Sequence, residues 1–370
     1  PSQEAYLARQ RALGMDFNGT TSEERVNYYF TLPSRNLRDG LEFMSAAIQT
    51  PLFDAAELER EREVVLGEYD RNESSPVYFL YERMNRLLWF AHPSRKDALG
   101  VRDIISTATP EQMREMQQTF YVPNNSLLVI AGDVSPDDGF ALAEQVFGDW
   151  ARGPDPFEVV EIPEHPPLPD DVAAVVLQPV NVTYLQWAWH GPDTRHDVQA
   201  DVFSFVLEQG ASAFQQALVD TGVALGAQLG YQTQRYVGPI TLTVVVPPGG
   251  EAAAIDAVHA QLASFTDPSY YSDEQMRAAQ TLLAVSELYG QQSASSLAHT
   301  LSYWWCSASL DYHRGYVDAL YGVTRDEISR YVSTYITDQP RAVVMLTSPE
   351  NAEAQGLDET WLLSRVRRTR

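Results

Sequence analysis

The sequence predicts an α+β fold made of two copies of one unit. Strand-like segments with alternating side chains lie between segments of helical periodicity. Both halves end alike, with a threonine-capped helix that begins at Thr109 or Thr324, then a tyrosine, then an apolar strand. Between the halves, residues 153–171 contain six prolines and form a stiff linker. We therefore expect an N-terminal domain over 1–152 and a homologous C-terminal domain over 172–370.

Glycine, proline and capping residues set the limits of the elements in the first half. Gly14 ends the first helix, Pro33 ends a β-rich strand, and Pro51 breaks the next helix. Asp54, with Glu57 three residues later, is a capping-box-like start for a charged helix. The expected elements are a helix over 4–13, a loop or edge strand over 15–25, a strand over 26–32, helices over 36–48, 55–73, 78–90 and 109–120, a buried strand over 126–132 and a helix over 135–150.

The pattern begins again after the linker. The expected strands cover 173–177, 183–189, 223–232, 238–246 and 341–346. The expected helices cover 197–207, 212–220, 251–264, 272–290, 293–301, 310–320 and 324–334.

Composition excludes several classes of partner. The net charge of −24, from 50 acidic and 26 basic residues, repels nucleic acid and anionic membranes. The same charge favours basic peptides, although solubility is a simpler explanation. A single cysteine, Cys306, permits neither an intrachain disulfide nor a cysteine metal cluster. Because no apolar run reaches membrane-spanning length, we expect no membrane span.

Two glutamates in the charged helix are candidate site residues. Glu61 and Glu68 are seven residues apart, which returns them to nearly the same helix face about 10 Å apart. A metal site could use one carboxylate as a ligand and the other as a supporting acid, but the pair is too widely spaced to hold one ion equally. The alternative is a solvated helix in which Arg60 and Arg62 form salt bridges.

The order of motifs around these glutamates resembles the insulinase/pitrilysin family of zinc peptidases, which includes processing peptidases. Each motif is weak alone, but together they run in register over nearly the whole chain. They are Asn18-Gly-Thr-Thr-Ser with Val26-Asn-Tyr-Tyr-Phe, Pro51-Leu-Phe, Glu61-Arg-Glu-Val-Val-Leu-Gly-Glu68, Ala91-His-Pro, Leu99-Gly, Tyr121-x-Pro-Asn-Asn, Ile130-Ala-Gly-Asp-Val and Val206-Leu-Glu-Gln-Gly-Ala-Ser.

The resemblance implies a fold and a set of site residues. Each domain is expected to be an antiparallel-rich sheet packed by helices. Glu68 is expected to be a zinc ligand and Glu61 to support the catalytic site, while a His-x-x-Glu-His motif supplies two further ligands and the general base. Zinc in such a site activates a water molecule. Asn18, Gly19 and Thr20 are expected on an edge strand that binds an extended peptide substrate.

The sequence departs from the family pattern at two places. No His-x-x-Glu-His occurs in it, and in the family that motif lies in the stretch that would precede Pro1. We therefore expect the zinc site to need ligands upstream of residue 1. Val219 and Leu225 stand where the family has a substrate-anchoring Arg and Tyr. Their absence favours a second homologous half or subunit that supplies this pair.

Three functions remain open. The first is the zinc-bearing half or subunit of a metalloendopeptidase that cleaves unfolded peptides. The second is a catalytically inactive family member that acts as a peptide-binding or scaffold partner. The third is a structural subunit of a larger, processing-peptidase-like complex. The compartment is open, with a periplasmic or other extracytoplasmic location favoured.

Overall fold

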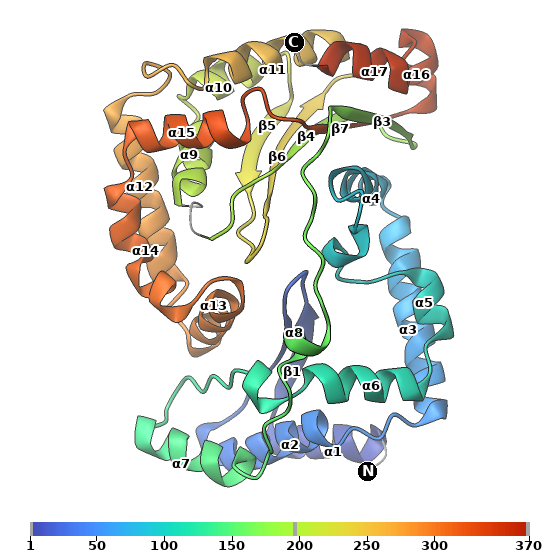
Figure 1. Cartoon of the computed structure of the whole chain (residues 1–370), viewed down its shortest axis with the longest axis vertical. Helices are drawn as coiled ribbons and strands as arrows, with labels where there is room; N and C mark the ends of the chain where they lie inside the picture. Colours follow the sequence, from blue (N-terminus) through green and yellow to red (C-terminus); the bar gives the residue numbers. More distant parts are fainter. Residues whose placement is uncertain (1–2, 195–197, 368–370) are drawn as a thin grey trace. The chain divides into compact units, whose positions relative to one another are not determined.

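The computed structural model describes residues 3–194 and 198–367, which form two compact units. Unit 1 contains the described residues up to Tyr69, then Asp97–Glu164 and Gly290–Cys306. Unit 2 contains Asp70–Lys96, His165–Tyr289 and the described residues from Ser307 onward. Each unit is a mixed assembly of helices and one sheet, as the predicted fold class requires (Figure 1).

Unit 1 has a two-stranded antiparallel sheet, made of β1 (Asp16–Thr21) and β2 (Val26–Thr31). A tight turn joins the strands, in which the Ser22 N–H donates to the Arg25 carbonyl at 2.8 Å. The helices of this unit are α1 (Gln3–Leu13), α2 (Leu37–Gln49), most of α3 (Ala55–Glu73), α5 (Arg102–Thr107), α6 (Pro110–Phe120), α7 (Pro136–Phe147), the short α8 (Pro156–Val159) and α13 (Ala294–Ser307).

Unit 2 has a five-stranded mixed sheet with the strand order β3-β7-β4-β6-β5. The strands are β3 (Val172–Leu177), β4 (Thr183–His190), β5 (Gly226–Tyr231), β6 (Pro239–Val246) and β7 (Ala342–Thr347). The helices are α4 (Pro76–Leu88), α9 (Val198–Glu208), α10 (Ala213–Gln215), α11 (Glu251–Ser264), α12 (Asp273–Tyr289), α14 (Leu310–Gly322), α15 (Arg325–Tyr335), α16 (Pro349–Gln355) and α17 (Glu359–Val366).

Helices cover both faces of the five-stranded sheet. Side chains of α9, α11, α12 and α15 build the larger core around Trp187, Trp189 and Phe203, all of them fully buried. On the opposite face, α4 packs Leu80 and Met84 against β4 and β7 (Figure 1). Burial on both faces explains why β4 and β7 are largely apolar and lack a regular polar alternation.

Two helices belong by sequence to one half of the chain and by packing to the unit of the other half. Helix α4 comes from the first half but lies in unit 2, and α13 comes from the second half but lies in unit 1. The predicted domain limits, 1–152 and 172–370 with the linker 153–171, follow the sequence repeat and remain a prediction. The compact units depend in addition on these two helices.

Most predicted elements are present, and both predicted threonine caps are confirmed. Thr109 and Thr324 each form a capping box, with Gln112 and Glu327 respectively. Asp54 caps α3 by accepting from the Ala56 and Glu57 N–H groups at 2.9 and 3.0 Å. The first residue of the predicted helix 197–207, Asp197, lies outside the described residues.

Three expectations were wrong or incomplete. Residues 126–132 form no strand, because no described backbone pairs with this apolar segment, and a strand exists only with a partner. The proline-rich stretch 153–171 is not extended throughout, since Asp155 caps the short helix α8. Helices α5, α16 and α17 were not predicted, because they span only six to eight residues and carry little periodicity. None of the described helices combines the length and apolarity needed to cross a membrane.

Candidate functional site: a glutamate helix and an open strand edge

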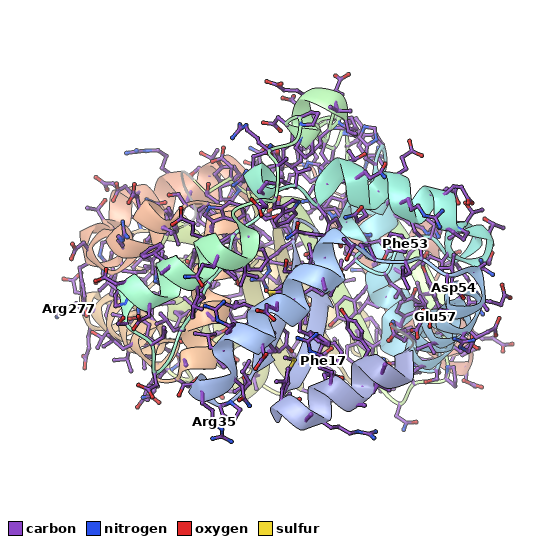
Figure 2. All side chains as sticks on the ribbon, turned by 90° about the horizontal axis from the view of Figure 1, so that it is seen from below. Phe17, Arg35, Phe53, Asp54, Glu57 and Arg277 are labelled. Carbon is purple, nitrogen blue, oxygen red and sulfur yellow. The ribbon has the colours of Figure 1, made fainter. Side chains whose placement is uncertain are left out.

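Helix α3 presents both candidate glutamates, and a strained residue precedes it. Phe53 has a positive φ of 48°, which is an uncommon backbone conformation for a residue with a bulky side chain. It directly precedes Asp54, whose side chain caps the helix. Figure 2 shows Phe53, Asp54 and Glu57 together at the start of this helix. Because α3 continues without a break from Ala55 to Glu73, Glu61 and Glu68 share one face, as predicted.

The surroundings of the two glutamates differ. Glu61 is exposed, whereas Glu68 is half-buried and has no hydrogen-bond or ion-pair partner among the described residues. The arginines considered as salt-bridge partners lie against other carboxylates. Arg60 is 3.9 Å from Glu57, and Arg62 pairs with Glu59. Glu68 is thus a carboxylate on a continuous helix, and no residue of 3–194 or 198–367 forms an ion pair with it.

Tyr69 fixes the rotation of α3 beside Glu68. Its side chain is buried, and its hydroxyl donates to the Gly100 carbonyl. The guanidinium of Arg102 lies 5.6 Å from the centre of the Tyr69 ring, an additional cation–π contact. Since Tyr69 and Glu68 are adjacent, this anchor holds Glu68 at the margin between the packed and the exposed faces of the helix.

The described residues do not fit a complete zinc site. Within 3–194 and 198–367, no group of three histidine, cysteine, aspartate or glutamate side chains is placed to hold a metal ion. Two of the histidines, His165 and His190, instead pack against Trp89 in unit 2, where the ring centres of Trp89 and His190 stack 4.5 Å apart. The ring of His92 lies against that of His165, with 5.9 Å between the ring centres. His196 lies outside the described residues. The chain offers Glu68 as a candidate ligand but no described imidazole to join it, so no step of hydrolysis is assigned to these residues.

The second part of the candidate site is the β1–β2 hairpin, which carries Asn18, Gly19 and Thr20. One face of the hairpin packs on α13. There Arg25 donates to Ser302 Oγ at 3.0 Å, and Asn27 Nδ2 lies 3.1 Å from His299 Nδ1. The ring of Tyr29 meets His299 edge-on at 4.3 Å. Asn18 and Thr20 are paired with Tyr29 and Asn27, so they lie on this same face.

The opposite face of the hairpin packs on α2. Gly40 lies so close to the hairpin that a Cβ there would meet Leu32 at 2.9 Å and Phe30 at 3.0 Å. The Tyr28 hydroxyl on this face is 2.8 Å from the Tyr121 hydroxyl. The hairpin is therefore held from both sides, while every residue of β1 remains exposed along its outer edge.

The turn determines which backbone groups of β1 point outward. Ser22 and Arg25 are a hydrogen-bonded pair, and such pairs alternate along an antiparallel ladder. Phe17, Gly19 and Thr21 therefore direct their N–H and C=O groups away from β2. The Gly19 N–H agrees with this assignment, since it donates to the Asn18 side-chain oxygen at 2.8 Å and not to β2. Sequence reasoning located this strand but could not give the parity, which depends on the turn.

The positions of the absent Arg/Tyr pair lie in unit 2. Val219 is partly buried against the main core, and Leu225 is 61 % exposed just before β5. Neither side chain carries a group that could anchor a peptide by charge or hydrogen bond.

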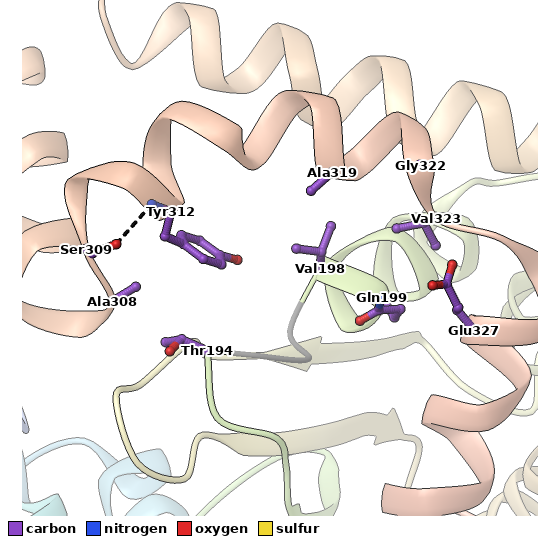
Figure 3. A pocket seen from close by; sticks show the side chains of 10 residues that line it. All are labelled: Thr194, Val198, Gln199, Ala308, Ser309, Tyr312, Ala319, Gly322, Val323 and Glu327. Carbon is purple, nitrogen blue, oxygen red and sulfur yellow. Dashed lines mark hydrogen bonds between the residues drawn. The ribbon is translucent and has the colours of Figure 1, made fainter.

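Unit 2 also contains an open pocket of about 660 Å³ between the start of α9 and helices α14 and α15 (Figure 3). Its carboxylate, Glu327, is committed to the cap of α15, where it accepts from the Thr324 N–H and hydroxyl at 2.8 Å. These bonds hold the pKa of Glu327 below its usual value. The pocket thus presents no uncommitted acid or base.

Two family models match this chain, and they cover most of it. Residues 1–97 match the model described as "Insulinase (Peptidase family M16)", and residues 107–283 match "Peptidase M16 inactive domain". The chain belongs to the M16, or insulinase, family of peptidases, as the order of its motifs indicated.

Curated relatives of this chain are named as zinc proteases or processing-peptidase subunits. An uncharacterized zinc protease of Rickettsia felis is 28% identical over 141 residues, 38% of this chain and 34% of that protein. Zinc protease PqqE of Helicobacter pylori is 26% identical over 210 residues, 55% of this chain and 47% of that protein. The human mitochondrial-processing peptidase subunit beta is 28% identical over 137 residues, 37% of this chain and 28% of that protein. The matched segments therefore span between 28% and 47% of the length of these relatives.

Solved structures share the fold over nearly the whole chain. A protease from Helicobacter pylori superposes with a TM-score of 0.82 at 21% identity, covering 92% of this chain and 84% of that one. The periplasmic protease PqqL from Escherichia coli gives a TM-score of 0.75 at 15% identity, covering 99% of this chain and 43% of that one. At these identities the likeness establishes the fold alone.

Proposed function

We propose that this chain is a half or subunit of an M16-type metalloendopeptidase, and that it holds an unfolded peptide as an additional strand on β1. The proposal is based on the outer edge of β1. Its outward backbone groups at Phe17, Gly19 and Thr21 can pair with any extended peptide, since backbone pairing does not depend on the peptide's side chains.

The packing of the hairpin supports this assignment. An added strand gains affinity only if the receiving edge is already ordered, because ordering costs about 1–2 kcal/mol per residue. Contacts to α13 on one face and to α2 on the other hold β1 in place before a peptide arrives. The Asn18 side chain covers the Gly19 N–H and must turn aside when a peptide binds.

For the metal, we propose that Glu68 is one zinc ligand of the complete enzyme and that Glu61 supports it from the same helix face. The support is the half-buried Glu68 carboxylate on a helix fixed by Tyr69, together with membership of a family whose curated relatives are named zinc proteases. The other ligands, and the Arg/Tyr pair that Val219 and Leu225 replace, would come from outside the described residues or from a second homologous half.

The alternative is an inactive member that binds peptides for a partner subunit. Two observations favour it: the described residues form no metal-binding group, and residues 107–283 match a domain described as inactive. This alternative shares the strand edge of β1 with the first proposal and differs only in the metal.

Binding at the edge is tested with Gly19→Pro, which removes one outward N–H. Proline is tolerated at an edge position whose N–H faces solvent, so the hairpin should still fold. Fluorescence anisotropy with a labelled, unstructured peptide should show about tenfold weaker binding, about 1.4 kcal/mol, for the lost hydrogen bond and the blocked approach. The control is Gly19→Ala, which keeps the N–H and brings a Cβ only to 3.3 Å from Tyr28. Equal affinity of Gly19→Pro and the unmodified protein would refute the edge site.

The metal is tested by measuring zinc in the protein purified from its own host, beside Glu68→Gln. If Glu68 is a ligand, the variant should lose zinc while its peptide affinity is unchanged. Full zinc content in Glu68→Gln would exclude the assignment, and absence of zinc from the unmodified protein would favour the inactive alternative.

A further inference from the structure

Asn18 and Gly19 form the single Asn-Gly pair of the sequence, and this pair lies on the exposed strand β1. The Asn18 side-chain oxygen accepts a hydrogen bond from the Gly19 N–H at 2.8 Å. Because Oδ1 is bonded directly to Cγ, the same contact brings the amide carbon of Asn18 close to the Gly19 nitrogen. These are the two atoms that join when an asparagine cyclises onto the main chain, so they are held near the geometry that this reaction needs.

The position of Gly19 in the hairpin leaves its nitrogen available. Gly19 directs its N–H away from β2, so the β1–β2 ladder does not hold this proton. Glycine has no Cβ to crowd an approaching group, and it permits backbone angles that other residues avoid. The Asn18 carbonyl faces β2 and must turn away before a ring can close. Since every residue of β1 is exposed, local opening of this edge strand permits that movement.

Two related pairs elsewhere in unit 1 show what distinguishes Asn18. Asp39-Gly40 and Asp138-Gly139 also place a side-chain carbonyl directly before a glycine. Both pairs lie inside helices, α2 and α7 respectively, and both glycines are buried. The Gly139 N–H, for example, donates to the Ser135 carbonyl at 2.9 Å. A glycine inside a helix has its N–H committed to the helix, whereas the Gly19 N–H bonds only the side chain that it would attack.

We propose that Asn18 is a site of spontaneous deamidation, in which the nitrogen of Gly19 is the nucleophile. This nitrogen loses its proton to the solvent and bonds to Cγ of Asn18, while the Cγ–Nδ2 bond breaks and ammonia leaves. Water then opens the cyclic imide. Hydrolysis at Cγ gives aspartate, and hydrolysis at the main-chain carbonyl carbon gives isoaspartate. Either product carries one more negative charge than the asparagine did.

The isoaspartate product changes the edge that we propose for peptide binding; this consequence rests on the proposed function, whereas the modification itself does not. In isoaspartate the main chain runs through Cβ and Cγ, so β1 gains one backbone carbon between Asn18 and Gly19. The outward groups of Phe17 and Gly19 then no longer share one register, and a carboxylate stands beside the Gly19 N–H. Conversely, a bound peptide that accepts from the Gly19 N–H withdraws this nitrogen from the reaction. Occupation of the edge should therefore protect Asn18.

The site is tested by incubating the folded protein at mildly alkaline pH and mapping its peptides by mass spectrometry, with fragmentation that separates aspartate from isoaspartate. Asn18 should acquire a carboxylate, while Asp39 and Asp138 remain ordinary aspartates. Gly19→Ala keeps the N–H but places a Cβ 3.3 Å from Tyr28, and it should slow the conversion severalfold. Asn18→Gln, whose longer side chain closes a less favourable ring, should abolish it. Conversion of Asn18 only after denaturation would overturn the proposal, as would equal rates in Gly19→Ala and the unmodified protein.

Two further measurements separate this site from the peptide edge. The converted protein, resolved from the original by anion exchange, should bind the labelled, unstructured peptide about tenfold more weakly, the effect of one or two lost backbone hydrogen bonds. Saturating peptide during the incubation should slow the conversion. If Asn18 converts but the peptide changes neither rate nor affinity, the modification stands and the edge site fails. If Asn18 does not convert in the folded protein, the modification fails, and Gly19→Pro still decides the edge site.

Discussion

Replacing Leu80 by alanine tests whether α4 is an integral part of unit 2. Leu80 is fully buried between α4 and the five-stranded sheet, where it packs with Met84 and Leu88 against β7. The helix lies in the first half of the sequence, but its apolar face is in the core of the second. If that packing holds, damage to α4 must appear in the stability of the sheet, far along the chain.

The expected loss is about 2–5 kcal/mol, the range for Leu→Ala at fully buried sites. The lower end applies if neighbours such as Met84 collapse into the space, since methionine adapts its shape readily. A loss of this size is a large fraction of a typical domain stability of about 5–15 kcal/mol.

The assay is native-state hydrogen exchange at β7, with β2 as a reference in unit 1. The opening free energy at Ala342–Thr347 should fall with Leu80→Ala, while the amides of β2 should exchange as before. The control is Tyr81→Ala on the same helix, whose side chain is 57% exposed and whose removal should change stability by about 0.5 kcal/mol or less. Unchanged protection at β7, or a loss confined to β2, would refute the assignment of α4 to unit 2.

Three further outcomes are expected. Burial lowers the pKa of His190 below its usual value, and nearby Lys96 lowers it further, so the folded state favours the neutral ring. The free energy of unfolding of unit 2 should therefore fall as the pH drops below about 6.5. In urea titrations, His190→Phe should flatten that dependence. Asn351→Leu removes a 2.6 Å hydrogen bond to the buried Glu251 carboxylate and should lower the free energy of unfolding by about 1–3 kcal/mol. The double variant Asn351→Leu with Glu251→Leu should recover part of that stability. A double variant less stable than Asn351→Leu alone would contradict this expectation. Thr324→Ala removes the cap of α15 and should cost about 0.5–2 kcal/mol by thermal denaturation, with no change if the helix start is already frayed.

Local signals in the sequence were sufficient for most helices. Thr109 and Thr324 were identified as caps because the side-chain oxygen of a threonine at a helix start accepts a backbone N–H there. The structure adds that each forms a capping box, with Gln112 and Glu327 respectively. Such signals act within one turn of helix and need no tertiary partner. Strand 126–132 was predicted with the same local reasoning and was wrong, because its existence depends on a partner strand that no local signal specifies.

Hydrophobic periodicity could not predict that α4 and α13 each pack in the unit formed mainly by the other half of the sequence. The spacing of Leu80, Met84 and Leu88 shows that one face of α4 is buried, and they are indeed buried. The pattern does not say which sheet covers that face. Consecutive elements usually pack on one another, so α4 was expected to pack on its sequence neighbours in the first half of the chain. The three-dimensional structure places α4 against β7 instead.

The candidate site shows the same division between local and tertiary information. That Glu61 and Glu68 share a face follows from helix geometry alone, but the pairing of Arg60 with Glu57, and not with a candidate ligand, depends on rotamers that the sequence does not fix. For β1, the sequence does not determine which backbone N–H groups point away from β2. A slip of one residue in the pairing of β1 with β2 would turn the Gly19 N–H inward and the Asn18 N–H outward. The turn at Ser22 and Arg25 decides between these registers, so the four residues of that turn determine which backbone groups a peptide could reach.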